Sequence, residues 1–302
     1  LIPFDELHEN DIVLIPAFGT TLEIEKILQA KGIQTEKYNT TCPFVEKVWN
    51  RSGQIAEKGY SIVVHGKPKH EETRATFSHA SSQTQTVIVN DMNEAIELSK
   101  YITGEKDSED FYAEFDGRYS SGFDITKDLQ RFGVVNQTTQ LATDTQAIAE
   151  YLKQVVKNHF KLNDETIQQR FADTRDTLCY ATNDNQSAAT ALLDTYADLA
   201  IVIGGYNSSN TSHLVELCED ELPTYFINSA EKIISSKEIL HCDWKTKHEY
   251  LTQAFLPAKT PVNILITSGA SCPDAVVEAV IEKLAGFFTA EKRIEMLIKE
   301  FA

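Results

Sequence analysis

Small polar side chains gather at residues 207–210, directly after an apolar run at residues 199–203 and a two-glycine turn. We expect a helix to begin here and to run over residues 211–218. The unpaired backbone N–H groups and the positive dipole end of a helix N-terminus favour an anion such as a phosphate. The alternative is that Ser209 or Asn210 only caps the helix.

The same order of apolar strand, turn and polar residues recurs along the chain. It is found at residues 41–45, 65–73, 136–139 and 267–273. The last segment repeats the anion-binding pattern, because Gly269 forms a turn and Ser271 supplies a hydroxyl before the helix expected at Pro273. Thr138 carries a hydroxyl that can both donate and accept a hydrogen bond. We expect its neighbour Thr139 to cap the next helix.

Two cysteines and a His–Glu pair supply further chemistry. Cys42 and Cys179 each lie in a turn before a predicted helix, where a thiolate is stabilised and accessible to iron. The alternative for each is a small buried apolar residue. His70 and Glu72 lie two residues apart on the turn after the strand that ends at Val64. That spacing suits an anion contact and a proton source, whereas the alternative is a solvated, charged loop.

Short apolar runs alternate with helical patterns over most of the chain. Strands are predicted at residues 12–15, 61–64, 86–89, 132–135, 199–203, 224–227 and 262–267. Helices are predicted at residues 21–30, 43–58, 91–102, 143–158, 186–196 and 273–284. This alternation is typical of parallel sheets built from strand–helix units, which bind ligands at the carboxyl ends of their strands. The sequence therefore predicts an α/β fold.

The composition argues against several classes of protein. The net charge of −17 argues against nucleic acid as a partner. No apolar stretch approaches 18 residues, so we expect a soluble protein without a membrane span. The five cysteines contain no C-x-x-C pair, which argues against a zinc ribbon or a ferredoxin-type cluster sequence. Any metal site must gather its ligands from distant segments.

Taken together and in this order, the polar segments and residues 176–182 resemble the 4-hydroxy-3-methylbut-2-enyl diphosphate reductase (LytB/IspH) family. The resemblance implies the iron–sulfur enzyme that ends the non-mevalonate isoprenoid pathway. Its reaction is the reductive dehydroxylation of an allylic diphosphate to isopentenyl and dimethylallyl diphosphate. The residues around Phe18, and the acidic and aromatic residues 104–122, are similar to the plant and cyanobacterial branch. The commoner bacterial sequence has histidine where Phe18 stands, and we interpret residues 104–122 as a surface insertion.

The resemblance also implies roles for individual residues. Glu72 supplies a proton, and Thr138 binds the substrate hydroxyl or relays a proton to it. The diphosphate is held by His70, Ser208, Ser209, Asn210 and Ser271. The implied cofactor is a [4Fe–4S] cluster on three cysteines, two of which match Cys42 and Cys179. The third belongs to a Gly-Phe-Cys segment upstream of the part that this chain matches, and we expect it to be missing before Leu1.

The remaining cysteines are weak substitutes for that third ligand. We expect Cys218 in the core, Cys242 in a polar loop and Cys272 beside the second anion-binding turn. None of them is expected to bind the cluster.

The family architecture implies three α/β domains in a pseudo-threefold arrangement around the cluster. We expect the remainder of an incomplete first domain at residues 1–41, the second domain at residues 42–178 and the third at residues 179–285. The second domain carries the acidic insertion, at residues 104–128. A C-terminal helix at residues 286–302 is expected to pack back on the first domain.

The implied partners are the allylic diphosphate and an electron-donor protein, ferredoxin or flavodoxin. The expected location is a bacterial cytoplasm, with the plastid stroma as the alternative. Two other functions stay open. One is a cluster-less relative that binds diphosphates without turnover. The other is a hydrolase or transferase, for which the chain shows neither a nucleophile with its base nor a Gly-x-x-x-x-Gly-Lys loop.

Overall fold

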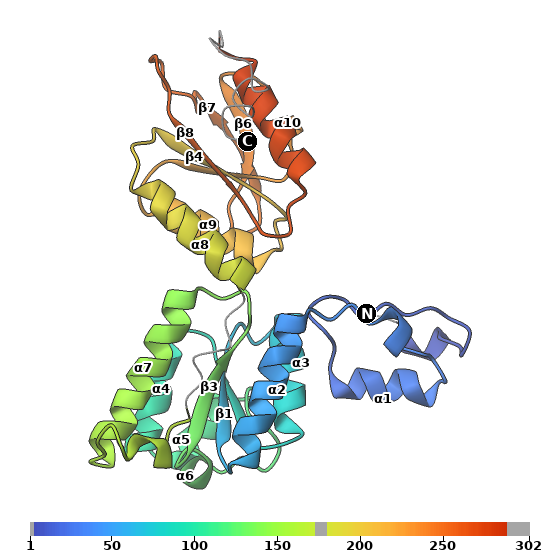
Figure 1. The fold of residues 1–302 in the computed structure, drawn as a ribbon, viewed down its shortest axis with the longest axis vertical. Coiled ribbons are helices and arrows are strands. Elements are labelled where there is room, and N and C mark those ends of the chain that lie inside the picture. Colours follow the sequence, from blue (N-terminus) through green and yellow to red (C-terminus); the bar gives the residue numbers. More distant parts are fainter. Residues whose placement is uncertain (1–2, 173–179, 289–302) are drawn as a thin grey trace. The chain divides into compact units, whose positions relative to one another are not determined.

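The computed structural model describes residues 3–172 and 180–288. The chain forms two compact units, residues 1–179 and 180–302. Each unit contains a three-stranded parallel sheet with helices on both faces (Figure 1). The predicted α/β class with parallel sheets is therefore confirmed. Within the described residues, no helix combines the length and the apolar character that a membrane span requires.

In the first unit, β1 (Ser61–His65) lies between β2 (Thr86–Val89) and β3 (Phe132–Asn136). Every residue of the three strands is buried, as expected for continuous apolar runs in a sheet that is covered on both faces. The register places His65 beside Asn136, so the polar residues after β1 and β3 leave the same edge of the sheet. All three strands were predicted to within one residue.

Helices cover both faces of this sheet. The helices of this unit are α1 (Leu22–Ala30), α2 (Pro43–Glu57), α3 (Glu71–Ser81), α4 (Met92–Thr103), α5 (Ser108–Glu114), α6 (Ile125–Asp128) and α7 (Ala142–His159), of which α1 packs with the N-terminal residues and not on the sheet. α2 and α3 lie on one face and α4 and α7 on the other (Figure 1). Alternation along β1 explains the two cores, because Ile62 and Val64 pack towards α2 while Val63 packs towards α4 and α7.

The N-terminal residues form a small cluster of their own. Ile15, Leu28 and Ile33 are buried together, and the backbone N–H of Leu22 donates to Ser78 Oγ of α3 at 3.0 Å. The predicted strand at residues 12–15 is wrong. Only Ile15 forms a single bridge, to Asn39, while Ile12 is 70% exposed. An apolar run needs a paired neighbour to become a strand, and this run has only that one bridge within the described residues.

Residues 104–122 do not lie at the surface throughout, which corrects that part of their interpretation. They contain α5, and Phe111 and Phe115 are fully buried in the same core as α4 and α7. The rings of Phe111 and Phe115 stack with centroids 5.0 Å apart. The aromatic side chains therefore extend the core, whereas the acidic side chains between them had suggested an exposed segment.

The second unit repeats the layered arrangement. Its strands are β4 (Leu199–Ile203), β5 (Thr224–Ile227), β6 (Glu238–Cys242), β7 (Glu249–Gln253) and β8 (Ile264–Ser268), and its helices are α8 (Tyr180–Leu193), α9 (Ser209–Glu219) and α10 (Asp274–Ala285). The parallel sheet has the order β5-β4-β8, with α8 and α9 on one face and α10 on the other. β4 and β5 match their predicted positions, and α8 begins six residues earlier than predicted.

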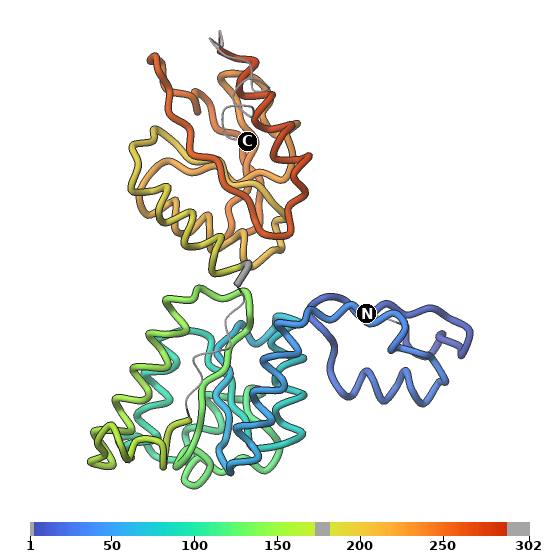
Figure 2. Tube along the Cα trace, viewed as in Figure 1, coloured from blue at the N-terminus to red at the C-terminus, as the bar shows by residue number. Residues whose placement is uncertain are grey.

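A hairpin in this unit was not predicted. β6 and β7 pair antiparallel, and the chain reverses between them at residues 243–248 (Figure 2). Cys242 ends β6 with its side chain 2% exposed, so its prediction as a polar-loop residue is wrong. The side chains of β7 are mostly exposed, which weakens the apolar alternation by which a strand is recognised.

Candidate functional site

His70 and Glu72 lie at the start of α3 rather than on a turn, which corrects their predicted placement. His70 is the N-cap of α3, and its Nδ1 accepts a hydrogen bond from the backbone N–H of Glu72 at 3.2 Å. The proton of the neutral imidazole is therefore on Nε2, which can donate to an anion. The pKa of His70 is lowered by burial and by nearby Lys67, against an opposing effect of Glu71.

The carboxylate of Glu72 is buried, with only 2% of the residue exposed. It accepts a hydrogen bond from the backbone N–H of Thr138, in the loop after β3. Burial raises the pKa of Glu72, and the hydrogen bonds from Thr138 oppose that rise. A carboxyl whose pKa is raised in this way retains its proton to higher pH, which a proton donor requires.

Gln137 organises the loop that carries Thr138. Its buried Oε1 accepts hydrogen bonds from the backbone N–H of Lys67 at 3.2 Å, from Thr73 Oγ1 at 2.9 Å and from Gln140 Nε2 at 3.1 Å. Its Nε2 donates to Thr139 Oγ1 at 2.6 Å. Thr139 is therefore bound by Gln137 and does not cap α7, whose N-cap is Leu141. Sequence reasoning missed Gln137, because no motif marks a glutamine that binds several segments.

Phe18 lies beside His70. The two rings meet edge to face with centroids 6.4 Å apart, and Phe18 is 38% exposed. The next residue, Gly19, has φ +74°, and a Cβ placed on it would lie 2.4 Å from the Trp49 ring, so this loop requires a glycine. Phe18 therefore contributes an apolar wall next to an imidazole.

Cys42 is the N-cap of α2, with Pro43 in the first helical turn as predicted. Its thiol is half-buried and unoxidised, and its backbone N–H donates to the carbonyl of Ala17 at 2.8 Å. A helix N-terminus stabilises a thiolate, so Cys42 fits a metal ligand. Cys179 lies outside the described residues.

The other three cysteines are less suited to a metal. Cys218 is fully buried in the core as predicted, and burial raises its pKa to about 11. Burial also raises the pKa of Cys242 and of Cys272. Among the described residues, no three His, Cys, Asp or Glu side chains come close enough together to hold a metal ion.

The second unit holds the segment at residues 207–210. Ser208, rather than Ser209 or Asn210, is the N-cap of α9, and its Oγ accepts from the backbone N–H of Thr211 at 3.2 Å. Asn210 is 5% exposed, and within the described part of the chain neither atom of its amide group has a hydrogen-bond partner. A buried unpaired amide is costly, and a polar ligand would remove that cost.

The turns after β4 and β8 meet at Thr211. A Cβ placed on Gly269 would lie 2.0 Å from Thr211 Oγ1, and one on Gly204 would lie 2.6 Å from the same atom. The two glycines let the first turn of α9 approach both strand ends. Ser271 follows in the second of these turns and is exposed. The structure thus brings Glu72, His70 and Thr138 together in the first unit, and the two serine-containing turns together in the second.

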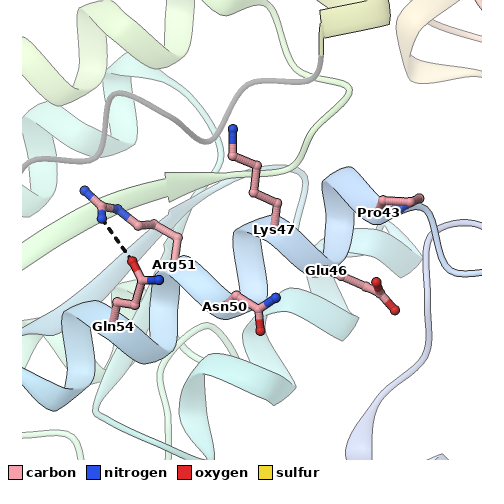
Figure 3. Close-up of a pocket in the computed structure, with 6 residues that line it drawn as sticks. All are labelled: Pro43, Glu46, Lys47, Asn50, Arg51 and Gln54. Carbon is pink, nitrogen blue, oxygen red and sulfur yellow. Dashed lines mark hydrogen bonds between the residues drawn. The ribbon is translucent and has the colours of Figure 1, made fainter.

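A cavity of about 330 Å³ lies along α2. It is lined by Pro43, Glu46, Lys47, Asn50, Arg51 and Gln54. Figure 3 shows Lys47 and Arg51 leaving the same side of the helix, as their spacing of four residues requires. Arg51 Nη1 donates to Gln54 Oε1 at 3.1 Å. The cavity begins next to Cys42 but contains none of the predicted site residues.

Two parallel sheets whose carboxyl ends carry polar turns and helix N-termini define an α/β protein suited to anionic ligands. The sequence model of the LytB protein family matches residues 2–285, and this chain belongs to that family. Members of the family bind an iron–sulfur cluster.

Curated relatives agree with this assignment. Proteins of Prochlorococcus marinus (strain AS9601) and of a Picosynechococcus species are named 4-hydroxy-3-methylbut-2-enyl diphosphate reductase. They are 38% and 39% identical to this chain, over 93% of its length and 69% and 68% of their own.

A solved structure of the Plasmodium falciparum reductase of this class shares the fold. The match has a TM-score of 0.64 at 20% identity, and it covers 100% of this chain and 82% of the solved chain. A second solved reductase is described as the terminal enzyme of the non-mevalonate pathway. This match has a TM-score of 0.50 at 24% identity, and it covers 93% of this chain and 78% of the solved chain.

Proposed function

We propose that this chain catalyses the reductive dehydroxylation of 4-hydroxy-3-methylbut-2-enyl diphosphate to isopentenyl and dimethylallyl diphosphate. This is the last step of the non-mevalonate isoprenoid pathway. Membership of the LytB family and the names of the curated relatives support the reaction. The single structural observation that carries the proposal is the buried Glu72 carboxyl, held by Thr138 beside the neutral imidazole of His70.

Glu72 is the proton donor in this proposal. Its raised pKa supports a protonated carboxyl when substrate enters, and its fixed position directs the proton to a single atom of the substrate. The Thr138 hydroxyl binds the substrate hydroxyl that leaves as water. Because the backbone N–H of Thr138 donates to Glu72, the two groups keep their spacing throughout the reaction.

The diphosphate is bound by neutral donors. His70 donates from Nε2, and Ser208, Ser209, Asn210 and Ser271 supply hydroxyl and amide donors at helix N-termini. The unpaired amide of Asn210 supports its role as a ligand-binding group. Binding of the diphosphate anchors the substrate, so that its hydroxyl end is held in one position for the reaction.

The cofactor in this proposal is a [4Fe–4S] cluster held by Cys42, Cys179 and a third cysteine. The position of Cys42 at a helix N-terminus supports its role as a thiolate ligand. When bound, the cluster supplies the two electrons of the reduction, delivered by ferredoxin or flavodoxin. The cyanobacterial relatives support a bacterial cytoplasm, with the plastid stroma as the alternative.

The proposed domains are residues 1–41, 42–178 with the insertion at 104–128, and 179–285, followed by residues 286–302. The separate cluster of Ile15, Leu28 and Ile33 supports the first boundary. The division of the chain after Cys179 supports the second.

Iron and acid-labile sulfide per chain test the proposal against a cluster-less diphosphate-binding relative. Protein purified without oxygen from the native start of its gene should contain about four of each. Cys42→Ala should lose most of the iron, whereas Cys272→Ala should retain it, although both thiols are half-buried. Equal iron content in the two variants would show that Cys42 does not bind the cluster. Little iron in the unaltered protein would favour the cluster-less alternative.

A further inference from the structure

The hairpin β6–β7 contacts the first turn of α9, which the sequence did not predict. Lys247, in the reversal between the two strands, donates from Nζ to the carbonyl of Tyr206 at 2.7 Å and to Ser212 Oγ at 3.1 Å. Ser212 Oγ in turn donates to the carbonyl of Ser208 at 3.0 Å. One ammonium group therefore holds both sides of the turn that carries Ser208.

The same turn is held at a second point. The hydroxyl of Tyr206 donates to Glu249 Oε1 of β7 at 2.7 Å, and Lys232 forms an ion pair with that carboxylate at 2.6 Å. Tyr206 is thus bound to the hairpin through both its carbonyl and its hydroxyl. The position of the 205–208 turn consequently depends on the hairpin.

Lys247 occupies this position at a conformational cost. Its φ is +61°, in the left-handed region that favours glycine. The reversal is stabilised by Asp243, whose Oδ1 accepts from the backbone N–H groups of Lys245 at 2.7 Å and Thr246 at 3.0 Å. A glycine would adopt this conformation without strain. We therefore expect the contacts of the lysine side chain to offset the strain of its backbone.

The charge of Lys247 lies close to the N-terminus of α9, because its ammonium contacts Ser212 in the first turn of that helix. A cation near a helix N-terminus opposes the helix dipole. An anion at the same place reverses the sign, because it is attracted by both the dipole and the ammonium. A strained residue whose charge would attract an anionic ligand is typical of a functional position.

We propose that Lys247 is a positioning residue of the diphosphate site, which fixes the 205–208 turn and adds the positive charge that Ser208, Ser209 and Asn210 lack. This inference rests on the proposed function. Lys247 acts through Tyr206 and Ser212 and through its field at the start of α9. It therefore determines affinity for the diphosphate rather than the chemical step.

The test compares Lys247→Met, which keeps the length of the side chain, with Lys245→Met. Lys245 lies in the same reversal, but its ammonium stacks over Trp244 at 5.1 Å. Thermal unfolding of the full chain is measured with and without inorganic diphosphate. Lys247→Met should weaken diphosphate binding by about tenfold, the usual effect of losing a charge-assisted contact. Lys245→Met should bind as the unaltered chain does, and Lys247→Arg should restore most of the binding.

Three readouts separate this role from a purely structural one. Without diphosphate, Lys247→Met should unfold at nearly the same temperature as the unaltered chain, because the backbone strain is the same in both and the lost ammonium contacts are only partly buried. A structural role would instead lower that temperature. In the active enzyme KM should rise while kcat changes little. Full diphosphate-dependent stabilisation of Lys247→Met overturns the inference alone. Absence of stabilisation in the unaltered chain overturns the diphosphate site itself, and this inference with it.

Discussion

The backbone N–H of Thr138 donates a hydrogen bond to the carboxylate of Glu72, which joins the loop after β3 to the first turn of α3. The two residues come together because β1 and β3 are neighbours in the sheet, with Val64 beside Val135. Among the described residues no lysine or arginine pairs with Glu72. A buried carboxyl held by neutral donors is easier to protonate than one held by a cation.

Replacing Glu72 with glutamine should abolish most turnover while the fold is retained. The amide oxygen of glutamine can still accept the hydrogen bond from Thr138, but it has no acidic proton to donate. We expect a loss of kcat of about 100-fold or more, the usual contribution of general acid catalysis. The iron content should be unchanged. Turnover at the unaltered rate would exclude Glu72 as the proton donor.

The same variant has an expected pH signature. The folded-state pKa of Glu72 is raised above its ordinary value of 4.5, so the folded protein binds the proton more tightly than the unfolded chain. The free energy of unfolding should therefore fall as pH rises from 4.5 through the raised pKa. Glu72→Gln should lack this fall, as denaturant unfolding at several pH values would show. If the free energy of unfolding changed with pH in the same way in both proteins, the raised pKa of Glu72 would be contradicted.

Gln137→Met should destabilise the first unit and reduce turnover. The change keeps the side-chain length but leaves the backbone N–H of Lys67 and the hydroxyl of Thr73 without their acceptor. Unpaired buried groups cost about 1–3 kcal/mol each, and the loop that carries Thr138 should shift with them. The control is Gln29→Met, which changes an exposed glutamine on α1 and should alter stability by less than about 0.5 kcal/mol. Equal stability of the two variants would show that the Gln137 contacts contribute little.

The sequence predicted the strands that are buried on both faces. β2, β4 and β5 match their predicted bounds, because continuous apolar runs of four or five residues are typical of parallel strands. α3 was missed, since it buries small and polar residues such as Thr73, Ala75 and Thr76, which give no strong apolar period. The run at residues 12–15 had the pattern of a strand, but pairing depends on residues far away in the sequence.

The candidate site also combines features that the sequence predicted with features that it did not. Cys42 and the segment at residues 207–210 were recognisable as helix starts because the signals for capping are local, although the cap itself is Ser208 and not Ser209 or Asn210. The roles of Gln137 and Lys247 depend on contacts with residues that lie 35 to 70 positions away, as with Lys247 and Ser212 or Lys67 and Gln137. No local pattern encodes such contacts.

Gly269→Ala should destabilise the second unit. The new Cβ would lie 2.0 Å from Thr211 Oγ1 and 3.2 Å from Thr211 Cβ, so α9 must move away from the end of β8. Overpacking of this kind costs about 1–3 kcal/mol. Thr211→Ala removes the clashing hydroxyl, so the double variant should recover part of the loss.

Gly205→Ala provides the control, because a Cβ there meets nothing within 4 Å. Its free energy of unfolding should stay within about 0.5 kcal/mol of the unaltered value. If Gly269→Ala were equally neutral, the close approach of α9 to β8 would not be required.

His241 should make stability fall at acidic pH. It is 4% exposed, its Nε2 lies 2.8 Å from Thr252 Oγ1, and the rings of Tyr225 and Tyr250 pack against it. Burial lowers its pKa from 6.5 to about 4. The unfolded chain therefore binds the proton more tightly, and the free energy of unfolding should decrease as pH falls from 6.5 to 4.

His241→Gln should flatten this decrease, whereas the exposed His248→Gln in the same hairpin should keep it. Glu72 acts with the opposite sign over part of this range, but its contribution is common to all three proteins and cancels in the comparison. If the free energy of unfolding of His241→Gln fell with pH as steeply as in the unaltered protein, His241 would be protonated without unfolding of the unit. The hairpin that carries it would then open independently of the sheet, and the contacts from Lys247 to Tyr206 and Ser212 would not hold the 205–208 turn in acid.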